Sequence, residues 1–163
     1  FRVCWLYTHG GLYLDDDRIP MLSPEAMVTQ PRCLAPVTAS RGVDHKIFPW
    51  LRYNPRIELV VTLAAPGQPF FLCILNNIIL NHLHHYYGHD VTEVTGPTLV
   101  AKCFPAHASN VSLSWYYDDE DTINAYETDT PIVRGDHQSV LSPSHYSELW
   151  RNRLVHTCDS RLQ

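Results

Sequence analysis

The chain has no hydrophobic run long enough to cross a membrane. Its most apolar stretch, residues 70–80, is interrupted by Asn76 and Asn77, whereas a membrane-spanning helix needs about 20 consecutive apolar residues. An excess of positive charge is also missing, since the net charge is -5 and the isoelectric point is near 6.0. Nothing in this balance favours nucleic acid or an anionic membrane as a partner. We therefore expect a soluble ectodomain, secreted or on the extracellular face of a membrane, with any membrane anchor outside the given sequence.

Motifs that mark common catalytic sites are missing as well. The sequence has no Gly-x-Ser-x-Gly nucleophile elbow, no Walker loop and no glycine pattern for dinucleotide binding. Paired acids such as Glu120 and Asp121 occur in any acidic loop. We expect no enzyme, no cofactor and no metal ion.

One run of histidines deserves a test as a metal site. His82 and His84 share a face on a strand, whereas His85 and His89 share one on a helix. A catalytic zinc ion needs three protein ligands and an open position, and no His-Glu-x-x-His motif accompanies these residues. We interpret the run as a histidine-rich surface segment. A zinc enzyme built on residues 82–89 is the less favoured alternative.

Two segments in the second half of the chain have the pattern of half-buried strands. Leu99, Ala101 and Cys103 fall on one face of a period-2 pattern with Lys102 on the other, and apolar residues alternate with serines in residues 111–115, which end at Trp115. This period of two is typical of a strand with one buried face. Cys158 lies about 55 residues after Cys103.

These residues resemble an immunoglobulin-superfamily domain of the constant (C1) type, as found in light chains and in antigen-receptor and histocompatibility proteins. The matching segments are residues 98–105, 111–115, 127–131 and 141–150. The resemblance implies an all-β chain, with an immunoglobulin-like β-sandwich in residues 91–163 and a β-rich region of uncertain fold in residues 1–90. Two features depart from the pattern. His156 stands where the tyrosine corner usually has its Tyr, and the chain ends five residues after Cys158, before a final strand G.

The resemblance also implies a disulfide between Cys103 and Cys158, packed against the buried indole of Trp115. A disulfide there removes Cys103 as a nucleophile for the nearby His107. Closing so long a loop contributes about 4 kcal/mol in the chain-entropy account.

Five cysteines leave one thiol without an intrachain partner. We expect Cys4 and Cys33 to form the second pair and Cys73 to be left over, because Cys73 lies in an apolar run. Spacing alone leaves the other connectivities open.

The first 90 residues predict mainly short strands. Residues 1–7 read as a strand, and Ser23 is a candidate N-cap for a single helical turn. Further along, apolar runs predict an antiparallel meander with Asn76-Asn77 as its hairpin turn; the runs are residues 57–63, 70–75 and 78–83.

Three polar stretches are expected at the surface. Residues 15–17, all Asp, read as a solvated loop, because the alternating oxygen ligands and glycine of a calcium loop are absent. Asn110 begins the only usable N-glycosylation sequon. A tentative protein-binding rim is formed by the acidic cluster Asp118, Asp119, Glu120 and Asp121; a solvated loop is its alternative.

The immunoglobulin resemblance, the apolar meander and the missing catalytic motifs predict a recognition protein that binds a protein ligand. The resemblance implies an immune-system protein as the suspected partner. A viral decoy or immune-evasion glycoprotein fits this reading. The alternative is a light-chain-like structural subunit that forms a homo- or hetero-oligomer, in which the leftover cysteine links two chains.

Overall fold

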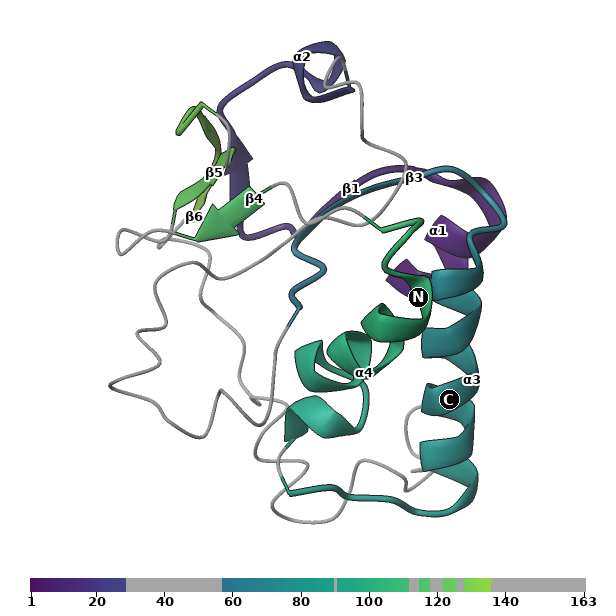
Figure 1. The fold of residues 1–163 in the computed structure, drawn as a ribbon. Helices are drawn as coiled ribbons and strands as arrows, with labels where there is room; N and C mark the ends of the chain where they lie inside the picture. Colours follow the sequence, from purple (N-terminus) through teal and green to yellow (C-terminus); the bar gives the residue numbers. More distant parts are fainter. Residues whose placement is uncertain (29–56, 90, 112–114, 118–121, 126–127, 136–163) are drawn as a thin grey trace, which may run out of the picture.

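The computed structural model describes residues 1–28, 57–89, 91–111, 115–117, 122–125 and 128–135. The elements follow in the order α1 (Arg2–His9), β1 (Gly11–Leu14), β2 (Arg18–Pro20), α2 (Pro24–Val28), β3 (Val61–Ala64), α3 (Pro69–Leu83), η2 (Val91–Glu93), α4 (Pro97–His107), β4 (Trp115–Tyr117), β5 (Thr122–Ala125) and β6 (Pro131–Gly135). The prediction of an all-β chain with an immunoglobulin-like sandwich is therefore wrong. The described part of the chain combines helices with two small sheets (Figure 1).

The longest helix, α3, replaces two strands of the expected meander. Pro69 stands in its first turn, where a missing N–H costs nothing. Phe70, Phe71 and Ile74 are fully buried, at a spacing that fits a helix. Asn77, expected in a hairpin turn, donates its Nδ2 hydrogen to the carbonyl of Cys73 at 2.9 Å, one helical turn earlier. The prediction failed because the run is apolar on nearly every side, so periodicity did not distinguish strand from helix.

Helix α4 likewise occupies the segment that was expected to be the first immunoglobulin strand. Leu99, Val100 and Ala101 are buried in succession, which a strand with one buried face does not allow. The helix starts after Gly96, whose backbone passes close to Thr92; a Cβ at residue 96 would lie 2.8 Å from the Thr92 Cα. A glycine is required at this approach.

A disulfide joins Cys73 of α3 to Cys103 of α4, with their Cα atoms 6.0 Å apart. A cysteine forms one disulfide, so this bond displaces the expected Cys103–Cys158 pair, and Cys73 is not left over. The crossing of two helices brings these cysteines together, and sequence spacing carries no sign of such a crossing. Cys4 is exposed with a free thiol; Cys33 and Cys158 lie outside the described residues.

The three longer helices enclose the larger of two hydrophobic cores. α3 packs against both α1 and α4; Figure 1 shows α4 beside it and α1 near its upper end. The buried residues of this core are Val3, Leu6, Ile57, Leu59, Ala64, Phe70, Phe71, Ile74, Leu99, Val100, Ala101, Cys103 and Val111. Among the described residues, no helix is both long and apolar enough to cross a membrane.

The two sheets carry the second core. β1 pairs with β3 in antiparallel fashion, and a four-stranded sheet has the order β2-β6-β5-β4. The strand expected over residues 111–115 shares only Trp115 with β4, which begins there and pairs Trp115 with Ala125 of β5; Val111 lies in no strand, and residues 112–114 lie outside the described residues. The core residues are Met27, Val60, Val61, Ile123, Ala125, Ile132 and Val133. Both cores take residues from either side of the boundary expected between residues 90 and 91, and the disulfide crosses it.

Candidate functional site

A cavity of about 570 Å³ opens where α1, β1, α3 and the start of α4 meet. Its apolar wall consists of Val3, Ile57, Leu59, Ile78, Pro97 and Val100, and its polar residues include Arg2, Tyr13, Asp15, Glu58 and Thr95. A volume of this size is usual for a small-molecule site, and here the lining combines apolar and polar surface in similar amounts.

Three of the polar residues form one connected group. Arg2 Nη1 lies 2.9 Å from Asp15 Oδ1, and the Tyr13 hydroxyl donates to the same oxygen at 2.6 Å. The guanidinium of Arg2 lies over the Tyr13 ring, 5.2 Å from its centroid. The side chain of Asp15 is only 21% exposed, so its interpretation as part of a solvated loop is wrong.

This environment changes the acidity of Tyr13. Burial, together with the hydrogen bond to Asp15 and the charge of that carboxylate, raises the pKa of Tyr13 to about 12. The phenol stays neutral at physiological pH and keeps donating its hydrogen bond to Asp15. In the described residues, Oδ2 of Asp15 and Nη2 of Arg2 make no hydrogen bond. The two residues thus offer an acceptor and a donor at the lining of the cavity.

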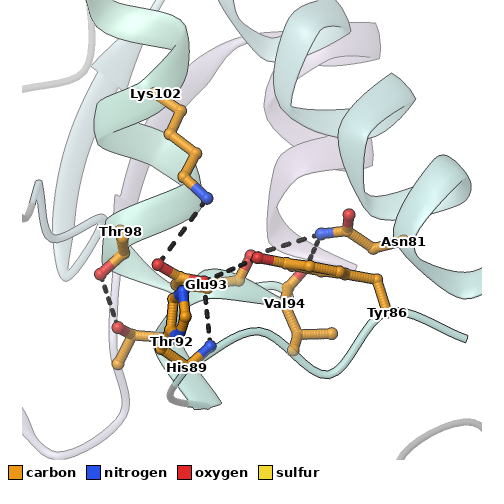
Figure 2. Close-up of polar contacts among 8 residues, drawn as sticks. All are labelled: Asn81, Tyr86, His89, Thr92, Glu93, Val94, Thr98 and Lys102. Atoms are coloured by element: carbon orange, nitrogen blue, oxygen red, sulfur yellow. Dashed lines mark hydrogen bonds and ion pairs between the residues drawn. The ribbon is translucent and has the colours of Figure 1, made fainter. Parts of the chain in front are cut away.

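A second polar cluster surrounds Glu93, at the far end of α3 (Figure 2). The Tyr86 hydroxyl donates to Glu93 Oε2 at 2.8 Å, and the backbone N–H of His89 donates to the same oxygen at 3.1 Å. Lys102 Nζ lies 3.9 Å from Oε1. Asn81 Nδ2 donates to the carbonyls of Glu93 and Val94, at 3.3 and 2.9 Å.

Glu93 is ionised in this cluster. Burial by itself raises the pKa of Glu93, but the hydrogen bonds from Tyr86 and His89 and the charge of Lys102 outweigh it, so the pKa is lowered. A carboxylate with this pKa and with its oxygens occupied is a poor general base. We interpret Glu93 as an anchor that holds the chain between α3 and α4.

The histidine run is spread over the end of α3 and the segment after it. His82 lies in the last turn of the helix, His84 follows its end, and His85 has a positive φ of 48°. His89 contributes its backbone to Glu93. Within the residues that the structure describes, no group of three or more His, Cys, Asp or Glu side chains is placed to hold a metal ion.

The remaining predicted surface residues are only partly described. Asn110 is exposed in the turn after α4, where its N–H donates to the carbonyl of His107 at 2.9 Å; its glycosylation stays a prediction. The tentative rim, residues 118–121, lies outside the described residues, as does the side chain of Trp115. The flanking residue Thr122 pairs with Arg134 of β6, which on its other side pairs with Ile19 of β2. β2 and β5 therefore start at the same end of the sheet.

An apolar stripe on α3 faces outward. Leu72, Ile79, Leu80 and Leu83 are between 41% and 65% exposed. Their spacing of 7, 8 and 11 residues from Leu72 places them on one side of the helix, with Asn76 among them. Sequence analysis missed this stripe because it expected these residues in two strands.

The sequence patterns did not identify the residues around the cavity as a group, nor those around Glu93. Arg2 and Asp15 are 13 positions apart, and Tyr86 and Lys102 approach Glu93 from two different elements. No protein family, curated protein or solved structure was found to match this chain.

Proposed function

We propose that this chain is an extracellular protein-recognition unit that binds its partner through the apolar stripe of α3. The exposure of Leu72, Ile79, Leu80 and Leu83 carries the proposal. Large aliphatic side chains that gather on one face mark interaction surfaces far more than scattered ones do. With the immunoglobulin sandwich overturned, the proposal rests on this stripe and no longer on the expected fold.

The disulfide supports the extracellular setting. Cys73–Cys103 joins α3 and α4, two of the three helices around the larger core. Stable disulfides persist mainly in oxidising compartments. The bond also holds α3 against α4, so the stripe lies on a fixed helix. Binding then costs little ordering entropy on this side of the interface.

The stripe fits an amphipathic helix of the partner. Its side chains repeat every three to four or seven to eight residues, which is the spacing that packs against a second helix. No Asp, Glu, Lys or Arg occurs between Leu72 and Leu83, and His82 is the one basic residue in that range. The partner's contact face is therefore apolar as well.

Binding of a designed probe tests this proposal. The probe is a fluorescent amphipathic peptide with leucines on one helical face, added to the full chain. The double variant I79K/L83K is expected to weaken its binding at least tenfold, whereas M21K, which alters an apolar residue exposed to a similar degree elsewhere, leaves the binding unchanged. Equal binding by wild type and I79K/L83K, with helix content preserved by circular dichroism, rules the stripe out. Self-association that I79K/L83K abolishes, in place of peptide binding, also contradicts the proposal.

A further inference from the structure

We propose that the cavity beside α1 binds an uncharged, planar small molecule that carries a lactam edge, meaning a ring N–H next to a ring C=O. This ligand site is separate from the α3 stripe and independent of the proposed protein recognition. The geometry of Arg2, Tyr13 and Asp15 against an apolar wall carries the proposal.

The wall of the cavity selects a flat apolar body. Val3 comes from α1, Ile78 from α3 and Val100 from α4, while Ile57 and Leu59 close the side toward β3. Aliphatic side chains from several elements enclose about 570 Å³. That space suits a molecule of two or three fused rings, whose transfer from water contributes about 25 cal/mol for each Å² of apolar surface buried.

The polar end selects the edge of the ligand. Asp15 Oδ1 already accepts from Arg2 Nη1 and from the Tyr13 hydroxyl, which leaves Oδ2 as an acceptor and Nη2 of Arg2 as a donor. A ligand N–H donates to Oδ2 while the adjacent ligand C=O accepts from Nη2. Both partners are charged, and such hydrogen bonds are stronger than those between neutral groups.

The charges on the cavity wall favour a neutral ligand. Arg2 and Asp15 lie 2.9 Å apart and largely cancel one another, so neither an anion nor a cation gains a full counter-charge from them. Glu58, the other carboxylate on the wall, has an interaction partner of its own and disfavours an anion. Tyr13 positions the group: its hydroxyl fixes Oδ1, and its ring lies beneath the guanidinium, 5.2 Å from the ring centroid to Cζ. With both ends held, little side-chain ordering remains to oppose binding.

Two matched probes test the edge. The first is 2-quinolone, a planar bicyclic lactam, and the second is N-methyl-2-quinolone, which lacks the N–H. Binding to the full chain is measured by ligand-observed NMR and by calorimetry. The lactam is expected to bind at least tenfold more tightly than its N-methyl form, because the methyl group removes the donor to Asp15 and leaves Oδ2 unpaired. Equal affinity of the two probes overturns the proposal.

Two matched variants test whether the ligand binds in this cavity. I78W fills the cavity from α3, whereas I79W adds the same side chain at the next residue, which is exposed and does not line the cavity. I78W is expected to abolish 2-quinolone binding, and I79W to leave it within twofold of wild type. D15N, a smaller change at the polar end, is expected to reduce the preference for the lactam to less than threefold. Binding that survives I78W, or a lactam preference that survives D15N, contradicts the assignment.

Discussion

Tyr13 and Glu93 show how neighbours set the charge of single side chains in this molecule. Tyr13 is kept neutral by burial and by Asp15, whereas Glu93 is kept ionised by Tyr86, His89 and Lys102 despite its burial. Asp15 lies only two residues from Tyr13, but the burial of Tyr13 and the contact of Lys102 with Glu93 depend on other elements. For that reason the sequence identified neither residue: an Asp in a run of three looks solvated, and a lone Glu in a polar link has no pattern of its own.

Tyr13 predicts a loss of stability in alkaline solution. Its folded-state pKa of about 12 lies above the ordinary value of 10.0, so its contribution to stability is complete below pH 10 and is lost as the pH rises from about 10 to 12. Urea unfolding between pH 8 and pH 12 should show this decline. Y13F should lose about 1 kcal/mol at pH 8, for the missing hydrogen bond, and should decline less steeply above pH 10. Identical alkaline slopes for the two proteins are incompatible with this account.

Glu93 predicts the opposite pH dependence. Its pKa is lowered from 4.5, so its contribution is present above the ordinary value and is lost as the pH falls through the folded-state value. E93Q should lower the free energy of unfolding at pH 7 by about 1–3 kcal/mol and should weaken the dependence on acid pH. D16N, at an exposed residue, is the control. Chemical denaturation at pH 3–7 measures both; an E93Q variant as stable as wild type at pH 7 contradicts the anchor role.

At the scale of secondary-structure elements, the fold depends on turn and cap residues and on which helices and strands pack together. Ser23 was predicted to cap a helical turn, and α2 does begin after it, with the Ala26 N–H 3.3 Å from the Ser23 hydroxyl. The strand predicted at residues 57–63 overlaps β3, and Trp115 lies in β4. These local signals succeeded because a few adjacent residues determine them. The helices α1, α3 and α4 were not predicted, because a short apolar run is compatible with either a helix or a strand and its packing with distant residues decides between them.

The turn between α1 and β1 requires a glycine. Gly10 has φ 67° and ψ -153°, and a Cβ there would lie 2.6 Å from the Ala64 carbonyl oxygen. Gly11 has φ 98° but open space around it. We expect G10A to cost about 3 kcal/mol or more, because it adds a clash to the backbone strain, and G11A to cost only about 1–2 kcal/mol. Urea denaturation of the two variants measures the difference; equal losses exclude the close approach at Gly10.

The disulfide between α3 and α4 gives the second prediction at this scale. Its cysteines are 30 residues apart, and the chain-entropy relation assigns such a loop about 3–4 kcal/mol. C73S/C103S should lose about that much stability, and a reducing agent should do the same to wild type. C4S removes the free, exposed thiol and should change neither value. An unfolding midpoint of wild type that is the same with and without reducing agent contradicts the presence of this bond.

For the whole molecule, the central claim is that α3 and α4 pack against each other and are joined by a disulfide, and that the chain does not form an immunoglobulin sandwich. Both hydrophobic cores combine residues from the two halves that the sequence suggested as separate regions. Composition, charge and the absence of a membrane-length run did not distinguish this arrangement from a sandwich. The Cys and Trp spacing favoured the sandwich, but residues 97–107 form a helix in which residues 98–101 are all buried, which a strand with one buried face does not allow.

Disulfide mapping tests that claim most directly, because trypsin separates all five cysteines. Cleavage after Lys and Arg places Cys73 in peptide 57–102, Cys103 in peptide 103–134 and Cys158 in peptide 154–161. Mass spectrometry of the unreduced digest should find peptides 57–102 and 103–134 linked to each other. A link between peptides 103–134 and 154–161 instead would restore the immunoglobulin arrangement and contradict the helical fold described above.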